Sequence, residues 1–85
     1  MYYYVYLITT EVKNRTISYV GYTKDLLKRM NLHNSSKGAK FTKGKKWKLI
    51  YYKAYKSKKD AMKQEYSLKK NYKLRNIIKN QSRNH

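Results

Sequence analysis

The sequence predicts a single α+β domain in which short strands alternate with helices. The chain has 85 residues, a length that suits one domain with a small core. Three segments are rich in aromatic and β-branched residues, as strands are, and two others begin with residues that cap helices. The 11 tyrosines and the absence of proline argue against a long disordered segment. We therefore expect one folded domain over residues 1–79 and a frayed polar tail over residues 80–85.

The first two strands are predicted to form an antiparallel hairpin. Residues 2–9 are rich in aromatic and β-branched residues on both alternating faces, which is typical of a strand in the centre of a sheet. Lys13 and Asn14 lie in a polar stretch that predicts a turn, and Glu11 is expected to belong to that turn. Residues 17–22 form the second predicted strand, and the short connection favours antiparallel pairing.

A helix over residues 24–34 is expected next, with Thr23 as its N-cap and Asp25 in its first turn. Serine, glycine and lysine residues then interrupt the pattern over residues 35–46, which predicts a basic loop. Residues 48–55 have the composition of a third strand.

The last helices are predicted from a capping signal and from apolar spacing. Ser57 followed by Asp60 resembles a capping box at the start of a helix over residues 58–71. Beyond it, the spacing of Leu74, Ile77 and Ile78 predicts a further short helix or turn.

The charge of the chain indicates a polyanionic partner. Lysine and arginine number 22 against 4 acidic residues, which gives a net charge of +18. Cysteine is absent, which excludes disulfides, zinc fingers and thiol catalysis. No apolar run approaches the roughly 18 residues that a membrane span requires, and the N-terminus lacks the pattern of a signal peptide. We expect a cytoplasmic domain that binds nucleic acid and no membrane.

Glu65 is the carboxylate that neither a turn nor a helix cap explains. It lies in the middle of its predicted helix, on the face that carries Ala61, Met62 and Leu68. A carboxylate on a packing face needs a cation, a metal or strong hydrogen bonds. One carboxylate combined with substrate phosphate and water is a common Mg²⁺ arrangement. The alternative, which the residues alone favour, is an ion pair with Lys69 four positions later.

Three other residue types suit phosphate chemistry. Arg29 and His33 are four positions apart and therefore project from one side of their helix. Arginine binds phosphate in a bidentate manner, although a surface pair with Asp25 is the alternative, and an isolated histidine is more often structural. Tyr6 and Tyr19 are candidates for proton transfer, because nearby cations or a metal-bound water lower the pKa of a phenol.

The order of these residues resembles the GIY-YIG nuclease domain, and most closely the small single-domain bacterial UPF0213 (YhbQ-like) group. The resemblance covers about residues 2–72. Each motif is weak alone, but several in one order are specific. Tyrosine replaces the first glycine of the family's first motif, which leaves the motif's last tyrosine in place. The resembling elements are Tyr4-Val5-Tyr6, Tyr19-Val20-Gly21, Arg29, His33 and Glu65.

The resemblance implies a three-stranded antiparallel sheet flanked by helices and a metal-dependent nuclease acting on DNA. In that family pattern, Tyr6 and Tyr19 would help to deprotonate the attacking water, and Arg29 would hold the scissile phosphate. His33 would assist proton transfer or orient a tyrosine. Glu65 would hold one divalent cation, Mg²⁺ or Mn²⁺. We expect an endonuclease with a preference for DNA structure over sequence, of use in DNA repair or recombination.

Substrate affinity is expected to come mainly from lysines through counterion release. Phe41 and Trp47 are candidates for base stacking, with packing at the third strand as the favoured alternative for Trp47. DNA is the expected partner, and the residues do not distinguish it from RNA. The predicted nucleic-acid contacts are Lys24, Lys37, Lys40, Lys43, Lys45, Lys46 and Lys69.

Two other functions compete with the nuclease. One is a catalytically idle, basic nucleic-acid-binding module, and the other is a subunit of a larger nuclease complex. We expect the chain itself to be a monomer or a weak dimer.

Overall fold

Three strands and three α-helices make up the fold of residues 1–83, the part of the chain that the computed structural model describes. The strands form one antiparallel sheet in the order β2-β1-β3, so β1 is central, as predicted. The α+β prediction is therefore confirmed. The elements are β1 (Tyr3–Val12), β2 (Arg15–Thr23), α1 (Leu26–Asn34), a 3-10 turn η1 (Lys40–Thr42), β3 (Lys48–Tyr55), α2 (Lys58–Lys70) and α3 (Tyr72–Arg83).

The hairpin of β1 and β2 turns at Lys13 and Asn14, as predicted. Both residues have positive φ angles, 50° and 65°, which is the backbone of a tight two-residue turn that suits the twist of the strands. Because the turn is so short, both strands extend further than predicted. Glu11 therefore lies within β1, paired with Thr16, rather than in the turn.

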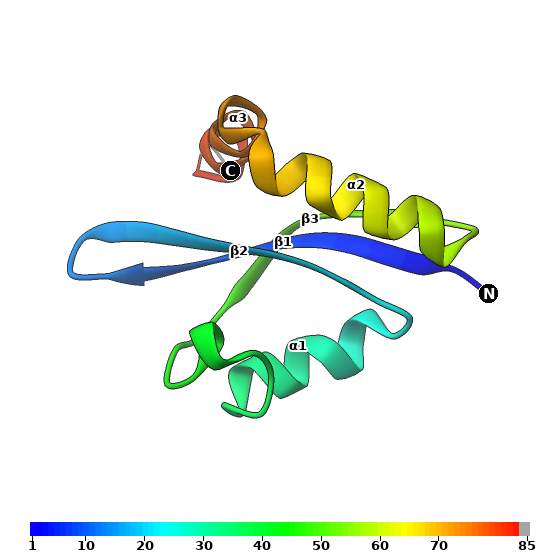
Figure 1. Ribbon diagram of the computed structural model, residues 1–85. Helices are drawn as coiled ribbons and strands as arrows, with labels where there is room; N and C mark the ends of the chain where they lie inside the picture. Colours follow the sequence, from blue (N-terminus) through cyan, green and yellow to red (C-terminus); the bar gives the residue numbers. More distant parts are fainter. Residues whose placement is uncertain (84–85) are drawn as a thin grey trace.

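Helices cover both faces of the sheet (Figure 1). Successive residues of β1 point to opposite faces, so Val5 and Leu7 pack in one apolar cluster with Ala61 of α2 and Ile78 of α3. Tyr6 and Ile8, also in β1, pack in a second cluster on the face that α1 covers. This two-sided burial explains why the first part of β1, from Tyr3 to Ile8, carries a large aromatic or aliphatic residue at each position.

Helix α1 begins at Leu26, two residues later than predicted, because Asp25 rather than Thr23 is its N-cap. The Asp25 carboxylate accepts a hydrogen bond from the backbone N–H of Lys28 at 3.1 Å. The Thr23 hydroxyl accepts the backbone N–H of Asp25 at 3.2 Å and so supports the turn before the helix. Helix α2 begins as predicted, with the Ser57 hydroxyl accepting from the backbone of Asp60 at 3.1 Å.

Helix α3 is longer than predicted, and it extends into the segment that the sequence predicts to be a polar tail. The Asn71 side chain accepts a hydrogen bond from the backbone N–H of Leu74 at 3.0 Å, which caps the new helix. Burial of Ile78 against the sheet then holds the helix by tertiary packing rather than by propensity. Residues 80–83 are consequently helical, whereas residues 84 and 85 lie outside the described part.

The helices of residues 1–83 are short and polar. The longest, α2, has 13 residues, and no described helix combines the length and apolar character that crossing a bilayer would demand.

Candidate active site

A pocket of about 630 Å³ lies beside the edge strand β2 and collects four of the five predicted site residues. Tyr6, Tyr19, Arg29 and Glu65 line it together. The fifth, His33, is buried next to the pocket, where its ring is hydrogen-bonded to Tyr6. Five residues that are far apart in the sequence therefore lie close together in the fold.

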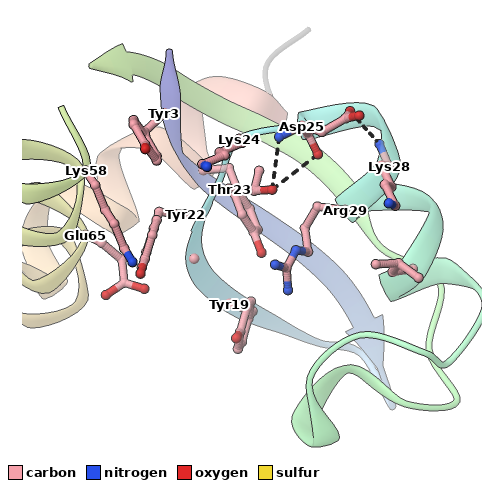
Figure 2. Close-up of a pocket in the computed structure, with 13 residues that line it drawn as sticks. Tyr3, Tyr19, Tyr22, Thr23, Lys24, Asp25, Lys28, Arg29, Lys58 and Glu65 are labelled. Carbon is pink, nitrogen blue, oxygen red and sulfur yellow. Dashed lines mark hydrogen bonds between the residues drawn. The ribbon is translucent and has the colours of Figure 1, made fainter. Parts of the chain in front are cut away.

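The sheet register brings the two tyrosines to one face. Tyr6 is paired with Gly21 across the hairpin, and Tyr19 lies two residues before Gly21 on the same face of β2. Arg29 comes from α1, which covers that face. Glu65 comes from α2 on the opposite face, and Figure 2 shows it across the β2 strand from Arg29. The two helices can line one pocket because β2 is at the edge of the sheet.

Gly21 leaves the space that the Tyr6 phenol occupies. A Cβ atom at position 21 would lie 2.6 Å from the Tyr6 Cζ atom, far inside van der Waals contact. Any side chain at position 21 would therefore collide with the Tyr6 ring, and glycine avoids this collision.

We expect Gly21→Ala to destabilise the fold by about 1–3 kcal/mol, because the added methyl group overpacks the site and must displace the Tyr6 ring. Chemical denaturation of the wild type and the variant measures this difference. Ser18→Ala on the same strand is the matched control and should change the free energy of unfolding far less. Equal stability of Gly21→Ala and wild type would contradict the close packing of Gly21 on Tyr6.

Tyr6 and His33 are both neutral near pH 7. The Tyr6 hydroxyl and the His33 Nε2 atom are 2.8 Å apart, and both side chains are at most 1% exposed. Burial, with a further contribution from Tyr19, raises the pKa of Tyr6 above its ordinary value. Burial and the nearby Arg29 charge lower the pKa of His33. A neutral imidazole in hydrogen-bond contact with a phenol is able to accept its proton.

Arg29 faces the pocket and does not form the predicted alternative pair with Asp25. In the described part of the chain, the Asp25 carboxylate is used to cap α1, and no ion pair joins it to Arg29. Figure 2 shows the Arg29 guanidinium directed into the pocket. Its planar group is suited to a phosphate bound there.

Glu65 forms the predicted ion pair and also lines the pocket. Its carboxylate is 3.5 Å from the Lys69 Nζ atom, so the predicted ion pair is present. Its side chain is also 18% exposed and lines the pocket. A pair this long with a half-exposed lysine contributes little to stability and leaves the carboxylate accessible.

The profile of the GIY-YIG catalytic domain family matches residues 2–79. The chain belongs to the GIY-YIG family. This family points to a nuclease with a nucleic-acid substrate, and it confirms the resemblance seen in the sequence.

Similar bacterial proteins carry the name UPF0213 protein, which states no activity. One from Bacillus pumilus is 48% identical over 52 residues, which cover 60% of this chain and 53% of the relative. One from Streptococcus agalactiae is 43% identical over 61 residues, covering 71% of this chain and 68% of the relative. One from Clostridium perfringens is 38% identical over 68 residues, covering 79% and 70%. The chain thus spans about half the length of the Bacillus relative. A comparison with solved structures finds no match.

Within the GIY-YIG domain, the predicted lysines fall into three groups. Lys24 lines the pocket, and Lys69 is paired with Glu65. The other predicted lysines belong to the loop between α1 and β3, which is not part of the pocket lining. The abundance of lysine in the sequence therefore does not indicate which lysines line the pocket. The lysines of the loop are Lys37, Lys40, Lys43, Lys45 and Lys46.

Lys28 and Lys58 also line the pocket, and neither is among the predicted nucleic-acid contacts given above. Lys58 is seven positions before Glu65, which is two helical turns, so both side chains lie on one face of α2. That spacing is a sequence signal for Lys58. Lys28 precedes Arg29 and has no comparable signal.

The two aromatic candidates of the basic loop differ in exposure. Trp47 is buried, and its indole N–H donates to the Thr42 carbonyl at 3.0 Å, so the packing alternative is confirmed. Phe41 is 51% exposed and stacks against Tyr19, with 6.2 Å between ring centroids. Phe41 remains a prediction as a base-stacking residue beside the pocket.

Proposed function

We propose that this protein is a metal-dependent endonuclease that hydrolyses phosphodiester bonds in DNA. The observation that carries the proposal is the meeting of Tyr6, Tyr19, Arg29 and Glu65 in one pocket, each from a different element. A module that only binds nucleic acid has no use for a carboxylate in a phosphate-binding pocket, because the carboxylate repels the substrate.

The pocket offers one carboxylate that does not cap a helix, and this fits a divalent cation bound mainly by water and substrate rather than a site in which protein side chains supply all the ligands. Residues 1–83 contain no group of three or more histidine, cysteine or acidic side chains placed to hold a metal. Of the two pocket carboxylates, Asp25 is engaged as a helix cap, which leaves Glu65 as the ligand. Mg²⁺ and Mn²⁺ accept such a site, because they bind one or two carboxylates together with water and phosphate oxygens. The cation would polarise the phosphoryl group.

The remaining groups of the pocket bind the phosphodiester and transfer protons. Arg29 binds the scissile phosphate and stabilises the negative charge that develops on it. Tyr6 takes a proton from the attacking water, and neutral His33 is in place to accept the Tyr6 proton. Tyr19 offers a second phenol to the same pocket. Lys24, Lys28 and Lys58 attract the backbone of the substrate to these groups.

Lysine and arginine contacts to phosphate carry no sequence information, so we expect selection by DNA structure. Branched or nicked DNA, as formed in DNA repair and recombination, is the substrate class that we propose. We also propose that the protein acts in the cytoplasm, as a monomer or a weak dimer.

The test is a cleavage assay of the wild-type protein with Mg²⁺ or Mn²⁺ on flaps, junctions, nicked duplexes and single strands of DNA and RNA. Binding of each substrate is measured in parallel. Metal-dependent cleavage of at least one DNA substrate supports the proposal. Tight, salt-sensitive binding of all substrates without cleavage would instead identify an idle binding module.

A further inference from the structure

The buried hydrogen bonds of the site continue past His33 to a threonine in the 3-10 turn. The His33 Nδ1 atom is 2.9 Å from the Thr42 hydroxyl, and that hydroxyl is 2.8 Å from the Ala39 carbonyl oxygen. His33 and Thr42 are both fully buried, at 0% exposure. Tyr6, His33 and Thr42 therefore form one chain of contacts that runs from the pocket into the protein.

The direction of each hydrogen bond in this chain can be worked out. Thr42 has one hydroxyl hydrogen, and a carbonyl oxygen has none to offer, so Thr42 donates to Ala39. The Thr42 oxygen must then accept from His33, which places the ring hydrogen on Nδ1. The Nε2 atom of His33 is left with its lone pair and accepts from the Tyr6 hydroxyl.

We propose that Thr42 is a positioning residue that fixes the Nδ1–H tautomer of His33, and thereby keeps Nε2 ready to receive the Tyr6 proton. This inference rests on the proposed nuclease function. As the attacking water gives a proton to the Tyr6 oxygen, the original Tyr6 proton passes to His33 Nε2. The hydroxide forms a bond to phosphorus, and the bond from phosphorus to the leaving oxygen breaks. The leaving oxygen takes a proton from solvent, and His33 returns its proton to solvent through Tyr6.

The loop that carries Thr42 is built to hold this contact. The Thr42 carbonyl accepts the Trp47 indole N–H at 3.0 Å. The Asn34 side chain accepts from the Trp47 backbone N–H at 2.6 Å and donates to the Trp47 carbonyl at 3.3 Å, which ties the loop to the end of α1. A Cβ atom at Gly38, in the same loop, would lie 2.5 Å from the same His33 Nδ1 atom, so the loop backbone packs closely against this side of the ring. The ring is therefore held in one orientation, with Nδ1 facing the loop.

The tautomer can be measured without any cleavage. The sequence has two histidines, so a His85→Gln background leaves His33 as the single imidazole in a nitrogen-15 NMR spectrum. We expect the Nδ1–H tautomer in this background and in Thr42→Ser, which retains the hydroxyl. In Thr42→Val, which has nearly the same shape but no acceptor, we expect a shift towards the Nε2–H tautomer. An unchanged tautomer in folded Thr42→Val, or an Nε2–H tautomer in the parent protein, would overturn the proposal.

The catalytic consequence is measured in single-turnover cleavage with the same variants. We expect Thr42→Val to cut about 10–100-fold more slowly, with the substrate Kd unchanged, and Thr42→Ser to recover most of the rate. If Thr42→Val does not fold, Thr42→Ala is used in its place with Thr42→Ser as the reference. A wild-type rate in Thr42→Val or Thr42→Ala would overturn the role of Thr42 in catalysis. If the parent protein cuts nothing but the tautomers behave as expected, the positioning role stands and the nuclease function fails.

Discussion

Replacement of Glu65 by glutamine is expected to abolish metal-dependent cleavage and to preserve DNA binding. The substitution keeps the size of the side chain and removes its charge, so the pocket loses its available carboxylate for a cation. We expect a loss of at least about 10²-fold in the cleavage rate, comparable to the loss of one strong electrostatic contact to a transition state. Binding should stay equal or become slightly tighter, because one negative charge facing the polyanion is removed.

Asp60→Asn is the matched control for Glu65→Gln. Asp60 is an exposed carboxylate on the same helix, and it does not line the pocket. This control should cut at the wild-type rate. Chelation of the metal should reduce wild-type cleavage to the level of Glu65→Gln, and added Mg²⁺ or Mn²⁺ should restore it only in the wild type.

A purely structural role for Glu65, as the partner of Lys69, predicts a different result. If Glu65 served only to pair with Lys69, then Lys69→Ala and Glu65→Gln would lower the thermal stability equally and neither would change cleavage. The separation of 3.5 Å and the exposure of Lys69 predict that both stability changes are small. Rapid cleavage by Glu65→Gln would therefore refute the metal-binding role.

The sequence predicts most of this fold because its signals are local. The two-sided apolar pattern of residues 2–9 indicates a central strand, and Lys13-Asn14 and Ser57 mark a turn and a helix start that the structure confirms. Helix α3 is underestimated because its stability comes from packing of Ile78 on the sheet, which no local pattern reports. The α1 start is misplaced because Thr23 and Asp25 are both good caps, and only their hydrogen bonds distinguish them.

The candidate site is harder to predict than the fold because it depends on topology. Arg29 and Glu65 come from helices on opposite faces of the sheet, and they share a pocket only because β2 is an edge strand. Glu65 could still be found in the sequence, because it is a carboxylate without a capping role in a very basic chain. Thr42 could not be found, because burial of a loop threonine leaves no periodic signal.

Tyr6→Phe is expected to reduce cleavage by about 10²–10⁴-fold, which is the range for the loss of a general base. The substitution retains the buried ring and removes only the hydroxyl that contacts His33. It also leaves the Nε2 atom of His33 without its partner, so the free energy of unfolding should fall by about 1–3 kcal/mol. Single-turnover cleavage and chemical denaturation measure the two effects, and the substrate Kd should not change.

Tyr19→Phe separates the two phenols of the pocket. Tyr19 lines the pocket, and its ring meets the edge of His33 with 5.3 Å between ring centroids, but no hydrogen bond joins the two side chains. We therefore expect a smaller loss for Tyr19→Phe than for Tyr6→Phe. The reverse order would assign the base to Tyr19.

The pH dependence of cleavage tests the role of His33 as the acceptor of the Tyr6 proton. His33 must be neutral to accept the Tyr6 proton, and its pKa lies below the ordinary value of 6.5 because of burial and Arg29. Wild-type cleavage should therefore persist as the pH falls through 6.5 and decline only at lower pH, where His33 becomes protonated. In Tyr6→Phe the residual cleavage should lose this decline, because no proton reaches His33 through a phenylalanine. A decline retained unchanged in Tyr6→Phe would show that His33 acts independently of Tyr6.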